Sequence, residues 1–142
     1  MKTKMTKFEI LAEFVKDISS ETKDVQTYLF VKDYISKYQL TINITSLPSK
    51  NKMIEVNTAL KFEDKENNTK KSYFELIYAS LIKIDENIKE KNELEKIILC
   101  DLQNQIKPNI VKVFTNLINN SGFKGVSFKN IDFEKLYNSR IN

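Results

Sequence analysis

Carboxylates, lysines and a single cysteine are the side chains of this chain with the most obvious chemical potential. The 142 residues include no histidine, which removes His general-base catalysis, Ser-His-Asp and Cys-His nucleophile systems, and zinc sites that need imidazole. Cys100 stands alone, so no intramolecular disulfide or cysteine cluster can form. Two glycines, Gly122 and Gly125, cannot make a phosphate-binding loop. We therefore expect no enzyme activity, no metal and no cofactor.

The formal net charge of +4 comes from the end of the chain. Residues 107–142 hold 6 basic and 2 acidic side chains, whereas residues 1–106 hold 17 of each. Only Arg140 is an arginine, the residue that reads guanine and phosphate with two parallel hydrogen bonds. A basic nucleic-acid-binding module is thus an alternative and not the leading interpretation. It would need one surface made by Lys107, Lys112, Lys124 and Lys129.

The length fits one domain over residues 1–142. No stretch approaches the roughly 18 consecutive apolar residues of a membrane span, and no apolar targeting segment follows the N-terminus. We expect a cytoplasmic protein that does not insert into a membrane.

Alternating apolar and polar residues predict three half-buried strands, each with one face toward a core. The apolar positions are Phe8, Ile10, Ala12 and Phe14 in the first, Tyr38, Leu40, Ile42 and Ile44 in the second, and Ile54, Val56, Leu60 and Phe62 in the third. A turn containing Pro48 joins the second strand to the third. In the polar loop 64–69, which precedes a fourth strand, we expect asparagine to supply the left-handed conformation of a turn.

The fourth strand, residues 72–84, is apolar on both faces. Phe74 and Leu76 lie on one face, and Tyr73 and Ile77 lie on the other. A two-layer domain of this size has a core on only one side of its sheet. The second apolar face therefore predicts a partner subunit or a client surface. Coverage by the N-terminal loop or by a helix is the alternative.

Helices follow the strands. A capping-box pattern begins at Asn92, and apolar residues then recur at spacings of three and four. Pro108 should kink or split this long helix, and Gly122 should end it. An Asp132 cap predicts a short last helix over residues 133–141. Strands and helices are segregated, which predicts an α+β fold: a four-stranded antiparallel sheet followed by a long helix and a short C-terminal helix.

The connection over residues 19–37 has no clean period. It contains Tyr28, Leu29, Phe30 and Tyr34. A connection this long is often functional, whereas the alternative is a strand-like loop that covers the sheet.

Several local strings, in order, resemble one family. They are Asp17-Ile18-Ser19 followed by Glu21, Glu75 at the start of a long apolar strand, Pro108-Asn109-Ile110 within the long helix, Gly122-Phe123 at its end, and Ile131-Asp132-Phe133-Glu134-Lys135-Leu136-Tyr137 at the last helix. Over about residues 8–137 the chain resembles SecB, the bacterial preprotein-export chaperone family.

The resemblance implies a homotetramer built as a dimer of dimers, with no enzyme activity. It implies that unfolded or preprotein clients are held without ATP in apolar grooves and delivered to the translocase SecA. The family is usually acidic, however, whereas this chain is basic. That departure leaves open a dedicated SecB-like chaperone of an antitoxin in a toxin–antitoxin–chaperone system.

Two sites follow from the resemblance. In the family, acidic residues on the outer sheet face contact SecA. The matching positions are Asp17, Glu21 and Glu75, with Tyr73 in place of an apolar contact.

The client groove is expected between the 19–37 connection, the sheet and the last helix. Its candidate residues are Leu29, Phe30, Tyr34, Leu47, Ile54, Phe133 and Tyr137.

Overall fold

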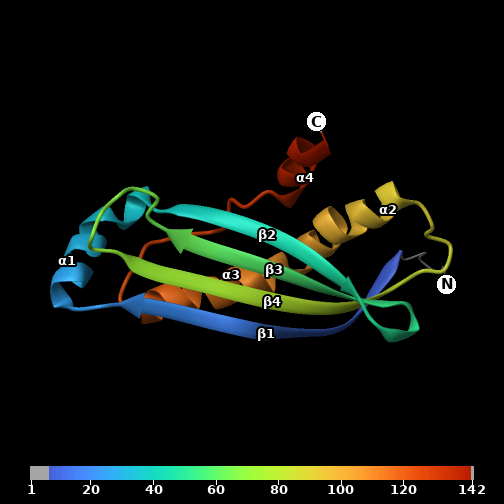
Figure 1. The fold of residues 1–142 in the computed structure, drawn as a ribbon, viewed down its shortest axis with the longest axis horizontal. Helices are drawn as coiled ribbons and strands as arrows, with labels where there is room; N and C mark the ends of the chain where they lie inside the picture. Colours follow the sequence, from blue (N-terminus) through green and yellow to red (C-terminus); the bar gives the residue numbers. More distant parts are fainter. Residues whose placement is uncertain (1–6, 142) are drawn as a thin grey trace.

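The computed structural model describes residues 7–141, and within them four antiparallel strands form one sheet in the order β1-β4-β3-β2 (Figure 1). The strands are β1 (Phe8–Thr22), β2 (Gln39–Pro48), β3 (Met53–Glu63) and β4 (Ser72–Ile84). The helices are α1 (Val25–Tyr34), α2 (Lys91–Lys96), α3 (Leu102–Asn120) and α4 (Phe133–Ile141). The predicted α+β fold is confirmed. Residues 1–6 and 142 of the predicted domain lie outside the described part of the chain.

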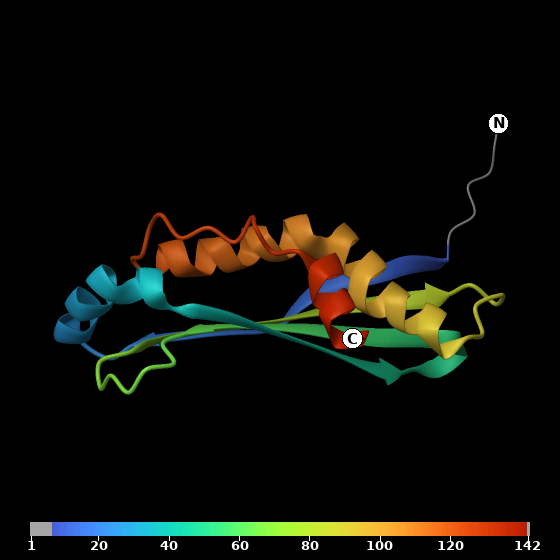
Figure 2. The same ribbon diagram turned by 90° about the horizontal axis from the view of Figure 1, so that it is seen from above.

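The domain has two layers. The α2 and α3 helices lie on one side of the sheet, which we call the helix face, and no described helix lies on the opposite side, the outer face (Figure 2). Large apolar side chains fill the space between the layers. They include Leu60, Phe74, Leu76 and Ile82 from the sheet and Leu102, Ile106, Ile110, Phe114 and Ile118 from α3. The alternating strands and the periodic helix therefore supply one common core.

The β1 strand does not keep one face toward this core. Its pairing with β4 shifts in register between Ile10 and Ala12. Phe8 lies on the helix face, whereas Phe14 pairs with Ala79 on the outer face and is 50% exposed. The prediction that Ala12 and Phe14 face the core is therefore wrong. A bulge adds one residue to the strand and reverses the face of residues 12–15, and a second shift between Val15 and Asp17 restores the original alternation.

The β4 strand has the predicted bounds, and it is central, between β1 and β3. Its helix-face residues are buried, and Tyr73, Glu75 and Ile77 are half-buried on the outer face. No described helix or loop covers that face (Figures 1 and 2). The alternative of coverage within the chain is therefore not supported over residues 7–141.

The long helical run differs from the prediction at two points. No side chain caps α2, which starts after Glu90, so the predicted Asn92 cap is wrong. The run is interrupted at Ile97–Asp101, a π turn, and not at Pro108, which lies inside α3. Proline removes only one bond of the helical ladder, and its neighbours maintain the helix here. The predicted break therefore exists, but it lies upstream of the proline.

Both helix ends predicted near the C-terminus are confirmed. Gly122 has a φ of 101°, and its N–H bonds to the carbonyl of Asn119 while the N–H of Phe123 bonds to the carbonyl of Ile118. This pair of bonds is the Schellman motif that ends a helix at glycine. Asp132 accepts the N–H of Lys135 at 3.0 Å and caps α4.

The 19–37 connection contains a helix and is not the strand-like loop of the alternative interpretation. Asp24 caps α1 by accepting the N–H of Thr27 at 2.8 Å, and this hydrogen bond lowers the pKa of the Asp24 carboxyl. Thr27, Val31 and Ile35 are buried at a spacing of four residues. The buried stripe is narrow, which explains why hydrophobic periodicity alone does not identify this helix.

Left-handed residues occur in the β2–β3 turn and not in the 64–69 loop. Asn51 and Lys52 have φ values of 59° and 62°, and these two are the only non-glycine residues with positive φ between residues 7 and 141. In the 64–69 loop, Asp64 instead accepts the N–H of Glu66 and the amide of Asn68. A side chain organises that loop, so the asparagine prediction there is wrong.

Candidate functional site

An apolar groove lies on the helix face at the β2 edge of the sheet. The α3 helix packs against β4, and the helix-face side chains of β2 remain half-exposed. The groove has a volume of about 520 Å³. Its lining residues are Tyr38, Leu40, Ile42, Phe62, Ser127, Phe128, Asn130, Ile131, Asp132, Lys135, Leu136 and Ser139. The sheet forms one wall, and the α3–α4 linker with α4 forms the other.

Aromatic side chains from three elements meet at one end of the groove. The ring of Phe62 lies 5.4 Å from that of Tyr38 and 5.2 Å from that of Phe128. The hydroxyl of Tyr38 accepts the N–H of Ser72 at 2.9 Å, and burial raises its pKa. The rings contact one another, and the hydrogen bond from the main chain of Ser72 holds Tyr38 in place. This end of the groove is therefore a preformed apolar surface.

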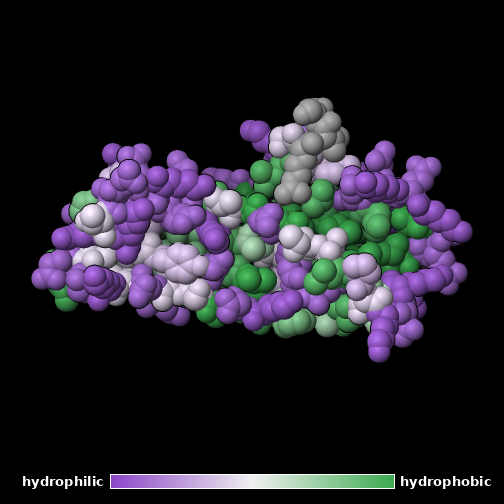
Figure 3. Space-filling view, viewed as in Figure 1, coloured by the Kyte–Doolittle hydropathy of each residue, from purple (hydrophilic) through white to green (hydrophobic). Residues whose placement is uncertain are grey.

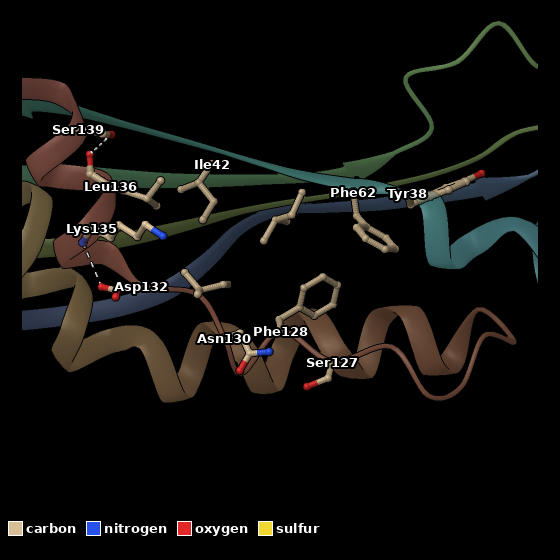
Figure 4. Close-up of a pocket in the computed structure, with 12 residues that line it drawn as sticks. Tyr38, Ile42, Phe62, Ser127, Phe128, Asn130, Asp132, Lys135, Leu136 and Ser139 are labelled. Atoms are coloured by element: carbon tan, nitrogen blue, oxygen red, sulfur yellow. Dashed lines mark hydrogen bonds between the residues drawn. The ribbon is translucent and has the colours of Figure 1, made fainter.

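The other end of the groove lies under α4. Figure 4 shows Leu136 of α4 pointing toward Ile42 of β2, and Phe128 of the linker pointing toward Phe62. Leu136 is 42% exposed. Polar side chains of Asn130, Asp132, Lys135 and Ser139 also line the groove. An apolar interior combined with polar groups is the usual character of a peptide-binding or ligand-binding cleft.

The groove is open along a free strand edge. The β2 strand is last in the sheet order and pairs with β3 on one side only. Its other main-chain groups are available to an added strand. A second apolar depression of about 380 Å³ lies at the far end of β2 and includes Pro48, Ile54, Ile84 and Leu94. Apolar surface thus occurs at both ends of an exposed edge, an arrangement that suits an extended polypeptide.

The structure brings only some of the predicted client residues to this groove. Tyr137 contributes to a small cavity between α4 and β2, and Ile54 lines the far depression. Phe133 is only 1% exposed, so it has almost no surface to offer a client. Leu47 pairs with Glu55 on the outer face and cannot reach the groove.

Leu29, Phe30 and Tyr34 lie on α1. Leu29 and Phe30 are 54% and 37% exposed, and the ring of Tyr34 stacks on that of Phe30 at 5.3 Å. None of the three lines the groove, although the segment after α1 leads to Tyr38. They form a separate apolar surface on α1, near the aromatic end of the groove. We call this surface the α1 patch.

Sequence reasoning missed most of the groove itself. The alternation predicts that Leu40, Ile42 and Phe62 face the core, and no sequence pattern marks Phe128. The alternation of β2 identifies the correct face of the strand. It does not reveal that α3 leaves this edge of the sheet partly open, because that depends on where the helix crosses the sheet.

The four predicted SecA-facing residues lie together on the outer face. In the pairing of β1 with β4, Glu21 lies opposite Tyr73 and Asp17 lies opposite Ile77. Tyr73 donates a hydrogen bond to Glu75, and this bond, with burial, raises the pKa of Tyr73. Figure 3 shows this side of the molecule, with apolar groups over the middle of the sheet between hydrophilic margins.

Lysines on the outer face contact its carboxylates, a feature that sequence reasoning missed. Lys16 forms an ion pair with Glu55, and that hydrogen bond lowers the pKa of Glu55. The Nζ of Lys61 lies 3.8 Å from Glu75. These pairs depend on the register of three neighbouring strands. No local sequence pattern therefore predicts them. Asp17 and Glu21 are exposed.

Cys100 and Lys107 have structural surroundings in the described part of the chain. Cys100 is buried, and burial raises the pKa of its thiol. Lys107 donates to the carbonyl of Ile131 and so contributes to the fold of the linker. Within residues 7–141, no group of three metal-binding side chains is found. No helix in the same range is both long and apolar enough to cross a membrane.

A family model and two curated proteins are similar to this chain over nearly its whole length. The family model described as preprotein translocase subunit SecB matches residues 1–142. The chain is 50% identical over 136 residues to a Pelagibacter ubique protein that carries the SecB protein-export name, covering 95% of this chain and 97% of that protein. It is 22% identical to the protein-export protein SecB of Bartonella bacilliformis, covering 94% and 83% of the two chains.

A solved structure shares the fold. It is the Mycobacterium tuberculosis Rv1957 SecB-like chaperone in complex with a ChAD peptide from the Rv1956 HigA1 antitoxin. The TM-score is 0.64 at 8% identity, with 88% of this chain and 91% of that chain covered. At such low identity the match supports the fold alone. With the full-length family match and the 50% identical relative, the chain belongs to the SecB family of preprotein-export chaperones.

Proposed function

We propose that this SecB-family chaperone holds unfolded preproteins by taking their extended apolar segments into the groove at the β2 edge. The observation that carries the proposal is the 520 Å³ groove lined by Tyr38, Phe62, Phe128 and Leu136 beside an unpaired strand edge. The holding needs no nucleotide, no cofactor and no catalytic step. It takes place in the cytoplasm, and residues 1–142 act as one domain.

Two physical effects favour such a client. Aromatic side chains offer large contact area at low rotamer cost, and each apolar client side chain that becomes buried contributes about 1.5–3 kcal/mol. The β2 edge can add main-chain hydrogen bonds that do not depend on client sequence. The first effect favours apolar segments and the second favours extended ones, so together they select unfolded chains over folded proteins.

We further propose that clients longer than the groove extend over other apolar surfaces. The α1 patch, made by Leu29, Phe30 and Tyr34, lies near the aromatic end, and the depression containing Ile54 lies at the far end of β2. Tyr137 borders β2 beneath α4. Several separate apolar surfaces favour binding at several points, each of moderate strength.

The outer face is the proposed contact for SecA. Among the predicted contact residues, Asp17 and Glu21 are exposed, whereas Glu75 is half-buried and has Lys61 as a partner. A basic partner segment would be attracted most strongly by carboxylates that are exposed and not already paired with a lysine. We therefore assign Asp17 and Glu21 the leading role, with Tyr73 and Glu75 as neighbours in the contact.

A homotetramer built as a dimer of dimers is the proposed assembly. The β1 strand is a 15-residue sheet edge with four exposed apolar side chains, Leu11, Phe14, Val15 and Ile18, each between 41% and 50% exposed. A long apolar strand edge is a site of association unless something covers it. A second copy of this chain would cover it.

The two client classes can be compared directly. The 50% identical relative carries a protein-export name, which favours preproteins over an antitoxin. The experiment measures, without nucleotide, how well the purified protein slows aggregation of an unfolded preprotein and of an unfolded antitoxin. We expect protection of several unrelated preproteins. Failure to protect any of them would contradict the holdase function, and protection of one antitoxin alone would favour the dedicated chaperone.

A further inference from the structure

Apolar side chains occupy every fourth position of the helical run that covers the sheet. They are Leu94, Ile98, Leu102, Ile106, Ile110, Phe114 and Ile118, and all of them pack in or against the core. In a regular α-helix each step of four residues rotates the next side chain by about 40°. Over six such steps the row would turn by about 240° and leave the sheet. Keeping the whole row buried therefore requires underwinding of the helix, apolar cover on more than one of its sides, or both.

The π turn at Ile97–Asp101 provides part of that underwinding. The N–H of Leu102 bonds to the carbonyl of Ile97, five residues back instead of four. A π turn fits one extra residue into one turn of helix and is costly enough to need support from its surroundings. It resets the phase between α2 and α3, so that Leu94 and Ile98 face the same sheet as Leu102 and Ile106.

Gln103 supplies support for the π turn. Its side chain is fully buried, and its Nε2 donates to the carbonyl of Ile98 inside the turn at 3.2 Å. Its Oε1 accepts the hydroxyl of Thr58, a fully buried residue of β3, at 3.0 Å. The amide thus joins the π turn to the sheet through two hydrogen bonds in a dry interior, where such bonds are most costly to lose.

The π turn in turn supports α4. The α4 helix contacts the π segment. Leu99, from the middle of the turn, lines the small cavity between β2 and α4 together with Ile42, Leu136 and Tyr137. Ile42 and Leu136 also line the apolar groove. The wall of the groove that α4 forms therefore rests on the residues that the π turn presents.

We propose that Gln103 is a positioning residue for client binding: its amide fixes the π turn, and the π turn holds α4 beside β2 so that the groove keeps its shape. The proposal rests on the groove being the client site. Gln103 does not line the groove, and its side chain is fully buried.

The test uses the full chain in its assembled form and compares Gln103→Met with the wild type. Methionine keeps the length of the side chain but cannot donate to Ile98, and its sulfur is only a weak acceptor in place of the amide oxygen that accepts from Thr58. The first readout is the reaction rate of Cys100 with a small thiol reagent, because this native cysteine is buried within the π turn at 3% exposure. The second is the affinity for an unfolded preprotein segment.

We expect the Cys100 thiol of Gln103→Met to react about tenfold faster through local opening of the turn, and the client to bind about fivefold more weakly. The matched control is Ile110→Val, which disturbs the same buried row downstream of the turn. It should leave both readouts within twofold of the wild type.

A second variant, Thr58→Val with Gln103→Met, separates positioning from stability. Replacing both partners of a buried hydrogen bond by apolar groups can restore stability. We expect its melting temperature to recover while Cys100 stays reactive and client binding stays weak. Wild-type thiol protection in Gln103→Met, or recovery of client binding together with stability, would overturn the proposal. If Leu136→Ser leaves client affinity unchanged while the thiol result holds, the groove assignment fails and the role of Gln103 in the turn remains.

Discussion

The hydroxyl of Tyr28 donates a hydrogen bond to the carbonyl oxygen of Gly122 at 2.9 Å. The same ring lies 5.0 Å from that of Phe123. Tyr28 belongs to α1 and Gly122 ends α3. This contact therefore joins α1, which carries the α1 patch, to the end of the long helix. Two independent features require glycine at this position. Its φ is 101°, and Tyr28 occupies the space where a side chain would begin.

We predict that Gly122→Ala lowers the free energy of unfolding by about 2–3 kcal/mol, since the left-handed conformation alone costs about 1 kcal/mol. A Cβ at this position would lie 2.8 Å from Cε1 of Tyr28, so the ring must also move. Denaturant unfolding measures the loss.

Gly125→Ala is the control. Its φ is 86°, but a Cβ there meets no atom within 4 Å. It should therefore lose only the conformational part, about 1 kcal/mol. Equal losses in the two variants would show that Tyr28 does not restrict position 122.

The groove prediction concerns Leu136. Truncation to serine removes part of the apolar wall opposite Ile42 and should weaken binding of an unfolded preprotein segment about fivefold, which corresponds to about 1 kcal/mol. Titration calorimetry or fluorescence anisotropy measures the change. Leu47→Ser is the control, because Leu47 is 54% exposed but lies on the outer face. An equal loss in both variants would argue against the groove as the client site.

The sequence predicts elements that are fixed by local patterns and misses those fixed by pairing. The bounds of β4 are correct because thirteen residues with apolar side chains on both faces have few other structures available. The Asp132 cap and Gly122 are correct because each satisfies main-chain groups within a few residues. The bulge after Ile10 is missed because it exists only in the alignment of β1 with β4.

The candidate site follows the same division. Its faces are predictable, since Leu40 and Ile42 alternate with polar residues. Its opening is not, because it depends on where the helical run crosses the sheet, and the bond from Thr58 to Gln103 joins residues 45 positions apart. Phe133 illustrates the converse error: an aromatic residue in a motif of the last helix is buried as part of the support for α4.

The assembly prediction concerns β1. Phe14 and Ile18 are 50% and 43% exposed at a free sheet edge. Replacing both with serine should raise the dissociation constant of the assembly about 100-fold, since their burial contributes about 3 kcal/mol. Light scattering after size-exclusion chromatography measures the mass. Val25→Ser with Leu29→Ser, on exposed sites of α1, should leave the mass unchanged. A wild-type protein that is already a monomer would contradict the tetramer.

The SecA prediction concerns Asp17 and Glu21, the two exposed carboxylates of the predicted contact. Asp17→Asn with Glu21→Gln keeps side-chain size and removes two charges. Binding to SecA should weaken about tenfold at low salt and less at high salt, because exposed charges are screened. Glu66→Gln, in the 64–69 loop, removes one charge outside the proposed contact and is the control for charge loss at a single position. Unchanged SecA affinity in the double variant would remove the outer face from the proposed contact.

The last prediction concerns Tyr78, whose hydroxyl donates to Glu13 at 2.7 Å while Asn109 donates to the same oxygen at 2.9 Å. Burial, and then the Glu13 carboxylate, raises the pKa of Tyr78 from 10.0 to about 12. The folded state therefore favours the protonated phenol. This contribution to stability is complete below pH 10 and is lost as the pH rises from 10 to about 12.

We expect the difference in unfolding free energy between the wild type and Tyr78→Phe to stay constant below pH 10 and to shrink above it. Glu13→Gln should move the tyrosinate absorbance titration of Tyr78 back toward 10, since it removes the charge but keeps an acceptor. A difference that stays constant through this range would mean that Tyr78 ionises as readily in the folded chain as in the unfolded one.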